Sequence, residues 1–192
     1  MKDPHSPSVD TLMAHFGEDR TMYDGAVVPP VFQNSLFTFK DWDDIDAAFE
    51  DRTRRPIYTR LINPTTRIAE QKIAALATAS RTDLEARLTA SGMAAVSAVI
   101  LHSICAGDHV VAVKNVYGPT NNFLNSYLRE KMGVETTFVP GTTLQDFAQS
   151  VTPKTKLIVL ESPSSAVFTL QNIQEVADFA RSKQITTMID NT

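Results

Sequence analysis

The sequence predicts an α/β fold with a mostly parallel sheet and helices on both faces. From about Thr65 onward, short apolar runs typical of buried strands alternate with stretches in which apolar residues recur at helical spacing. The links between these segments are short, as in strand–helix–strand units with parallel strands. With 192 residues, 43% of them hydrophobic and 21% charged, the chain is long enough to bury a substantial core.

Residues 1–65 differ from the rest of the chain and are predicted to form an N-terminal arm. They hold a Val-Val-Pro-Pro-Val stretch at 27–31, a short amphipathic helix that begins at Asp41, and a basic turn at 52–56. Few of these residues could pair as strands, so the arm would need another surface on which to pack. Residues 66–192 are predicted to be the front part of a larger domain.

After the arm, apolar spacing, caps and β-branched runs define a regular succession of elements. The expected elements are a helix capped by Thr65, a short strand at 86–90, a helix from Met93 to Ile104, a strand at 109–113, a helix from about Thr120 that buries Leu124, Tyr127, Leu128 and Met132 and ends at Gly133, a strand at 134–139, a helix capped by Thr143, a strand at 156–160, a helix with an Asn172/Glu175 capping box, and a strand at 185–189. Their crossovers should be right-handed.

Composition excludes several classes of protein. A formal net charge of −4 gives no basic footprint for nucleic acid or an anionic membrane. No apolar run approaches the roughly 20 residues that span a bilayer, and the N-terminus lacks the apolar core of a signal peptide. The four histidines show no chelating pattern, so no metal is implied. The single cysteine, Cys105, is expected to be buried and inert, and its isolation favours a reducing cytoplasm.

Residues that follow parallel strands gather at one edge of the sheet, where such folds bind their ligands. Four expected strand ends carry polar or aromatic side chains: 91–93 (Ser-Gly-Met), 115–118 (Asn-Val-Tyr-Gly), 161–165 (Glu-Ser-Pro-Ser-Ser) and 190–192 (Asp-Asn-Thr). These segments are therefore candidates for one binding site.

Each candidate has a functional and a structural interpretation. The start of the helix at Gly92 could hold a phosphate through exposed backbone N–H groups, or Ser91 could simply cap it. Tyr117 could stack on a planar ring, or lie in the core or at a rim. Asp190 could pair with the protonated nitrogen of a pyridine ring, or form a turn.

In the arm, Arg60 next to Tyr58 could bind a phosphate with its planar guanidinium or be an ordinary surface arginine. A phosphate, a flat aromatic ring and a protonated ring nitrogen together describe pyridoxal 5′-phosphate (PLP). A dinucleotide is less favoured because neither a G-x-G-x-x-G motif after the first strand nor a P-loop is present.

The motifs resemble those of the Cys/Met metabolism family of PLP enzymes, which includes cystathionine γ-synthase, cystathionine γ-lyase, methionine γ-lyase and O-acetylhomoserine sulfhydrylase. The matching stretches are Val-Val-Pro-Pro-Val-Phe-Gln-Asn-Ser-Leu-Phe (27–37), Tyr-Thr-Arg-Leu-Ile-Asn-Pro-Thr (58–65), Ser-Gly-Met-Ala-Ala (91–95), Val-Tyr-Gly-Pro-Thr (116–120), Glu-Ser-Pro-Ser (161–164) and Asp-Asn-Thr (190–192). Their order and spacing agree over nearly the whole chain.

The resemblance implies a truncated fold type I architecture, like that of the aspartate aminotransferases. Gly92 and Met93, next to Ser91, would hold the cofactor phosphate through backbone N–H groups. Tyr117 would stack on the ring and act as the catalytic residue that handles protons, and Asp190 would pair with the pyridine nitrogen.

The resemblance also adds Glu161 and Ser165 to the cofactor-binding residues. Tyr58 and Arg60 would reach the cofactor phosphate of a neighbouring subunit. It therefore implies a homo-oligomer, a dimer of dimers, with active sites shared between chains.

Four departures from the family pattern bear on activity. The sequence lacks the Ser-x-Thr-Lys motif that carries the Schiff-base lysine of the family, and it also lacks the family's C-terminal domain. Ser165 replaces the usual asparagine that bonds the ring oxygen of the cofactor. Pro119 replaces a common glycine or cysteine, which argues mildly against a methionine γ-lyase.

We therefore expect the front part of a PLP enzyme of sulfur amino acid metabolism, acting on a small amino-acid substrate. The reaction would be γ-replacement or γ/β-elimination on cystathionine or a homoserine ester, and the isolated chain should be inactive. One alternative is a non-catalytic truncated subunit or interaction module. A nucleotide-binding α/β domain is a third and less favoured interpretation.

Overall fold

The computed structural model describes residues 8–19, 21–53, 55–78 and 84–192. The chain divides into two compact units, Met1–Leu88 and Thr89–Thr192. The second unit contains a four-stranded sheet and the helices that cover it.

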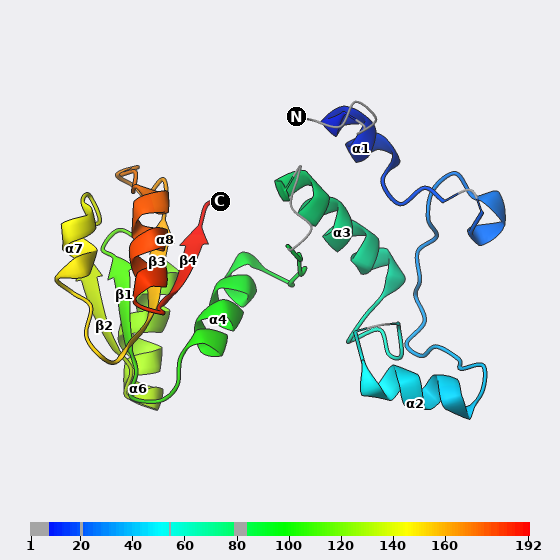
Figure 1. The fold of residues 1–192 in the computed structure, drawn as a ribbon, viewed down its shortest axis with the longest axis horizontal. Helices are drawn as coiled ribbons and strands as arrows, with labels where there is room; N and C mark the ends of the chain where they lie inside the picture. The colour runs from blue at the N-terminus through cyan, green and yellow to red at the C-terminus, as the bar shows by residue number, and fades with distance from the viewer. Residues whose placement is uncertain (1–7, 20, 54, 79–83) are drawn as a thin grey trace. The chain divides into compact units, whose positions relative to one another are not determined.

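The first unit is helical, with long extended connections. Its elements are α1 (Val9–His15), the 3-10 turn η1 (Tyr23–Gly25), α2 (Trp42–Glu50) and α3 (Pro64–Thr78) (Figure 1). Asp41 accepts the Asp44 N–H at 2.9 Å and caps α2, which confirms the helix predicted to begin there. Outside the helices, one isolated antiparallel bridge joins Leu36 to Tyr58 among the described residues.

The start of α3 differs from the prediction. The Asn63 carboxamide oxygen accepts the Thr65 N–H at 2.9 Å, so asparagine caps the helix, and Pro64 occupies its first position. The Thr65 hydroxyl instead accepts the Phe32 N–H at 2.9 Å. The predicted threonine cap is wrong because this hydroxyl fastens the extended segment to the helix.

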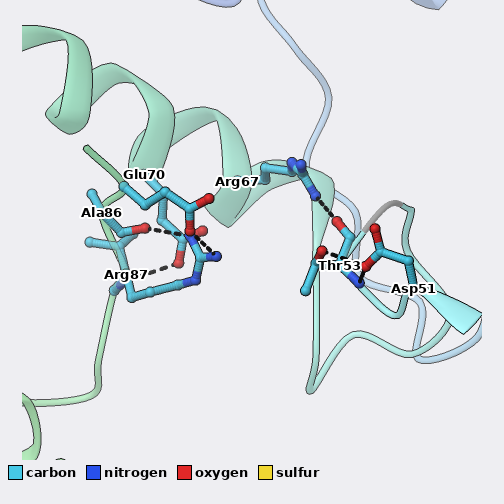
Figure 2. A network of polar contacts seen from close by, with 8 residues as sticks. Asp51, Thr53, Arg67, Glu70, Ala86 and Arg87 are labelled. Atoms are coloured by element: carbon cyan, nitrogen blue, oxygen red, sulfur yellow. Dashed lines mark hydrogen bonds and ion pairs between the residues drawn. The ribbon is translucent and has the colours of Figure 1, made fainter. Parts of the chain in front are cut away.

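The short strand predicted at 86–90 is also absent from the described structure. Its backbone is held by side chains rather than by a neighbouring strand (Figure 2). The Leu88 N–H donates to the Glu70 carboxylate on α3 at 3.0 Å, and the Arg87 guanidinium donates to the Ala86 carbonyl at 2.9 Å. These bonds occupy groups that a sheet ladder would use.

The second unit is an α/β layer structure whose strands all run parallel. Its elements are α4 (Gly92–Ser103), β1 (His109–Val113), α5 (Gly118–Asn122), the π-helical segment η2 (Phe123–Leu128), α6 (Arg129–Met132), β2 (Glu135–Val139), α7 (Leu144–Ala148), β3 (Thr155–Glu161), α8 (Ile173–Ser182) and β4 (Thr186–Asp190). The strand order is β2-β1-β3-β4. The predicted parallel α/β fold is confirmed.

Helices cover both faces of this sheet. Helix α4 contacts α5, and α7 contacts α8, which is the grouping that right-handed crossovers give for this strand order. Every residue of β1 is buried, as expected of a central strand between two helical layers. The largest fully buried side chains include Ile100, Leu124, Leu128, Phe147, Leu157, Ile158 and Leu160.

Two predicted inward residues are in fact exposed. Tyr127 is 53% exposed and stacks on Phe123 with 5.5 Å between the ring centroids. It lies in the π-helical segment, whose wider turn rotates residues out of the phase that α-helical spacing predicts. Cys105 is exposed because α4 ends at Ser103, which leaves the cysteine in the turn before β1.

The predicted helix ends are confirmed in the second unit. Gly133 closes α6 in the left-handed conformation with φ 63°, and Thr143 forms a capping box with Asp146. Asn172 accepts the Glu175 N–H at the start of α8. None of the described helices is long and apolar enough to cross a membrane.

Gly141 is the position in this unit least able to carry a side chain. Its φ is +72°, and an added Cβ would lie 2.7 Å from Val113 Cγ1. We expect Gly141→Ala to lower the free energy of unfolding by roughly 2–4 kcal/mol, from left-handed strain plus overpacking. Gly107→Ala is the control, since φ is +80° there but nothing lies within 4 Å of the added Cβ. If urea unfolding showed the same loss of stability in Gly141→Ala and Gly107→Ala, the packing argument would be contradicted.

His109 gives the second unit a predictable pH dependence. Its ring is buried, with Nδ1 2.7 Å from the Thr155 hydroxyl and Nε2 2.9 Å from the Thr137 hydroxyl. Burial lowers the pKa of His109 below its ordinary 6.5, although nearby Glu135 partly raises it. The unfolded chain therefore binds a proton at a higher pH than the folded chain does.

The contribution of neutral, buried His109 to the free energy of unfolding is therefore fully present above pH 6.5. It is lost as the pH falls through the lowered pKa of His109 in the folded chain. Urea midpoints measured between pH 7.5 and 5 should fall more steeply for the wild-type chain than for His109→Gln. His102→Gln, at an exposed position of α4, should keep the wild-type slope. Equal slopes for the wild type and His109→Gln would refute this assignment.

Candidate functional site

A cavity of about 580 Å³ lies at the carboxyl ends of β3 and β4 and at the start of α4. It is lined by Ser91, Gly92, Met93, Val96, Tyr117, Glu161, Pro163, Ser164, Ser165, Ala166, Phe168, Asp190 and Thr192. All of these residues belong to the second unit. The segments that the sequence singled out therefore meet around one space, although the described residues just before 91–93 form no strand.

The start of α4 supplies backbone donors to this cavity. The Ser91 hydroxyl accepts the Ala94 N–H at 3.1 Å, and its carbonyl accepts the Ala95 N–H at 3.2 Å. The N–H groups of Gly92 and Met93 have no acceptor among the described residues. An added Cβ at Gly92 would meet nothing within 4 Å. Two free donors and the positive end of the helix dipole thus face an open space suited to an anion.

Tyr117 enters the cavity from the segment after β1. The residue is 49% exposed and forms the N-cap position of α5. Its backbone N–H donates to Glu161 Oε2 at 2.6 Å, and its carbonyl accepts the Asn121 N–H at 3.0 Å. The backbone is therefore fixed on both sides, while the ring is left open to a ligand.

Two carboxylates lie together at the sheet edge. Glu161 and Asp190 are register partners at the ends of the parallel strands β3 and β4, so their side chains share a face. Asp190 Oδ1 accepts the Thr192 N–H at 3.1 Å and its hydroxyl at 2.6 Å. Oδ2 of Asp190 has no donor among the described residues, so it can accept a bond from a protonated ring nitrogen.

The loop after β3 forms the remaining wall. Its Ser165 N–H donates to the Asn115 carbonyl at 2.9 Å, which ties the loop to the segment that carries Tyr117. Buried Ser164 accepts the Phe168 N–H with its carbonyl and the Thr169 N–H with its hydroxyl. These bonds hold Phe168 in the left-handed conformation, with φ 54°.

Seven predicted site residues share the cavity: Ser91, Gly92, Met93, Tyr117, Glu161, Ser165 and Asp190. The other two, Tyr58 and Arg60, lie in the first unit, where the guanidinium carbon is 4.8 Å from the tyrosine ring centroid. Arg60 is exposed and Tyr58 is half-buried. This pair therefore belongs to a different unit from the residues that line the cavity.

The sequence reasoning missed Val96, Ala166 and Phe168, whereas Pro163, Ser164 and Thr192 lie in the predicted segments but had no role assigned. Phe168 is the most conspicuous, because it is 73% exposed and lines the cavity. The sequence signal that could have identified Phe168 is a single large aromatic residue in a loop made largely of small residues. The described residues include no cluster of three or more metal-ligating side chains.

The cavity thus combines donors for an anion, an aromatic ring and a free carboxylate oxygen. These groups fit a flat ligand that carries a phosphate and a basic ring nitrogen. The fit rests on the two N–H groups without acceptors at the start of α4 and on Oδ2 of Asp190.

Comparison with known proteins gives relatives for nearly the whole chain. The family model described as Cys/Met metabolism PLP-dependent enzyme matches residues 10–192. An O-succinylhomoserine sulfhydrylase of Pseudomonas aeruginosa is 32% identical over 189 residues, which are 98% of this chain and 45% of the relative. An L-methionine gamma-lyase of Treponema denticola is 35% identical over 181 residues, 93% of this chain and 43% of the relative. The chain spans less than half the length of these relatives.

Two solved structures share the fold. One is described as an O-acetylhomoserine (thiol)-lyase (metY) of Campylobacter jejuni, with a TM-score of 0.84 and 25% identity. The superposition covers 97% of this chain and 45% of the solved chain. The same structure carries N′-pyridoxyl-lysine-5′-monophosphate at position 205. The other, metB of Corynebacterium glutamicum, has a TM-score of 0.82 and 25% identity, with 99% of this chain and 46% of that chain covered.

Proposed function

Because the chain belongs to the family of Cys/Met metabolism PLP-dependent enzymes, we propose that it binds PLP and forms part of an enzyme acting on sulfur amino acids. Relatives named as sulfhydrylases and methionine gamma-lyases support this class of reaction. Within the class we propose γ-replacement or γ/β-elimination on cystathionine or a homoserine ester. One observation carries the proposal: the free N–H groups of α4, the Tyr117 ring and the Asp190 carboxylate line the same cavity.

Each of these groups would have a distinct role. The Gly92 and Met93 N–H groups would donate to the phosphate, and the helix dipole would favour its negative charge. Asp190 would hold the proton on the ring nitrogen through Oδ2, which has no donor among the described residues. PLP with a protonated nitrogen serves as an electron sink for the α-carbon of an amino acid.

Tyr117 would cover one face of the ring, and its phenol would give or take a proton close to the reacting carbon. The Ser165 hydroxyl would reach the ring oxygen in place of a longer amide side chain. The tied loop that carries Ser165 would keep that hydroxyl at the wall of the cavity.

The partner and location of the whole protein are part of the same proposal. We propose that residues 1–65 reach a neighbouring subunit in a dimer of dimers, where Tyr58 and Arg60 contribute to the partner's phosphate site. Strongly exposed apolar side chains support this role for the arm: Val27, Val28, Val31, Leu36, Trp42 and Leu61. A single cysteine supports a reducing cytoplasm.

Ligand titration tests the proposed function. The probe is 4′-deoxypyridoxine 5′-phosphate, which lacks the aldehyde and so cannot react with surface lysines. It should give saturable induced circular dichroism and stabilise the chain by about 2.7 kcal/mol at a hundredfold excess over Kd. Stabilisation by NAD or ATP with no dichroism from the probe would contradict the proposal and favour a nucleotide-binding domain.

A further inference from the structure

We infer that Glu161 is a positioning residue: its carboxylate holds the backbone N–H of Tyr117 and thereby sets the tyrosine ring in the cavity. The inference rests on the proposed function, because the ring matters only if a flat ligand binds beside it. It gives Glu161 an indirect role in place of the direct cofactor contact that the resemblance implies.

The contact joins a buried acid to an exposed aromatic. Glu161 is 7% exposed, and its Oε2 lies 2.6 Å from the Tyr117 nitrogen. Glu161 ends the core strand β3 and is paired there with Asp190 of β4, so the sheet places its backbone. A bond from a backbone N–H to an ionised carboxylate is roughly twice as strong as a neutral one. This acid is therefore a rigid anchor for the segment after β1.

The side chain of Tyr117 has no polar or aromatic anchor of its own among the described residues. Among the described residues, its hydroxyl makes no hydrogen bond and its ring makes no aromatic contact. The hydrogen bonds that place Tyr117 are therefore those of its backbone. The tie between the Ser165 N–H and the Asn115 carbonyl, together with the Glu161 bond, fixes this backbone to the end of β3.

A pair of substitutions separates the acceptor from the charge. Glu161→Gln removes the charge but keeps an oxygen that can accept the N–H, whereas Glu161→Met removes both and retains an unbranched chain of similar length. Thr155→Val is the matched control, because Thr155 is buried at the other end of β3 and its hydroxyl accepts the Thr152 N–H at 2.8 Å. It removes that bond and the 2.7 Å contact of the same hydroxyl with His109 Nδ1, both at the end of β3 far from Glu161.

The first readout needs no ligand. Amide hydrogen exchange by NMR should show Tyr117 protected in the wild-type chain, and about tenfold or more faster exchange in Glu161→Met. Glu161→Gln and Thr155→Val should keep most of that protection. Fast exchange at Tyr117 in the wild type would overturn the inference without any variant, so it stays testable even if Glu161→Met fails to fold.

The second readout is the induced dichroism of bound 4′-deoxypyridoxine 5′-phosphate. We expect its amplitude to fall severalfold in Glu161→Met, while Glu161→Gln keeps most of the amplitude and Thr155→Val all of it. Dichroism that is equal in the wild type and Glu161→Met would overturn the inference and leave the proposed function standing. No dichroism in the wild type would instead overturn the proposed function.

Discussion

Replacing Asp190 by alanine should weaken binding of 4′-deoxypyridoxine 5′-phosphate by about 30- to 150-fold. The carboxylate is half-buried, and its Oδ2 is free to accept a hydrogen bond from a protonated pyridine nitrogen. Loss of one partner of a buried charge pair costs about 2–5 kcal/mol of binding free energy. We expect about 2–3 kcal/mol here, because solvent reaches the half-buried carboxylate. Titration followed by induced dichroism gives the change in Kd.

Asp190→Asn separates the charge from the local turn. Its amide oxygen can still accept the bonds that Thr192 donates to Oδ1, but it offers no negative charge. We expect it to bind nearly as weakly as the alanine variant. Asp178→Ala, which removes an exposed aspartate on α8, should bind like the wild type. Wild-type affinity in Asp190→Asn would show that the charge of Asp190 has no part in binding.

Gly92→Pro should lower the affinity by about 10- to 150-fold without unfolding the chain. Proline has no N–H, so the phosphate would lose one charge-assisted bond, which contributes about 1.5–3 kcal/mol. Gly92 is the first residue of α4, where proline is well tolerated, and Ser91 before it is already extended, with φ −160° and ψ 161°. The substitution therefore removes a donor and keeps the helix.

Gly92→Ala is the matched control because it also adds a Cβ but keeps the N–H. Space is available for that atom, with nothing within 4 Å. The alanine variant should bind clearly more tightly than the proline variant, and both should unfold at similar urea concentrations. Equal affinities for the two variants would show that the Gly92 N–H does not contact the phosphate.

Most of the second unit follows from local sequence patterns. The strand at 109–113 is found as predicted, since a continuous apolar run bounded by a turn has few alternatives in a parallel sheet. Gly133 and Thr143 mark helix ends through their own conformational preferences and hydrogen bonds. The same regularity brought the strand ends together, so seven of the predicted site residues line one cavity.

The errors arise where distant contacts or an irregular local backbone override the pattern that the sequence shows. The Thr65 hydroxyl bonds to Phe32, and the backbone at Leu88 bonds to Glu70, and neither partner is close in sequence. Tyr127 is turned outward by a π-helical segment that apolar spacing does not reveal. Phe168 lines the cavity through a left-handed backbone that buried Ser164 stabilises, which only the folded loop shows.

NMR mapping of 4′-deoxypyridoxine 5′-phosphate on the isotope-labelled chain tests most directly whether this cavity is the ligand site. The largest shift changes should fall on the amides of Gly92 and Met93, the ring of Tyr117 and the segment that ends at Asp190. Changes centred instead on His109 and Lys154, at the opposite ends of the strands, would contradict the assignment of this cavity as the PLP site.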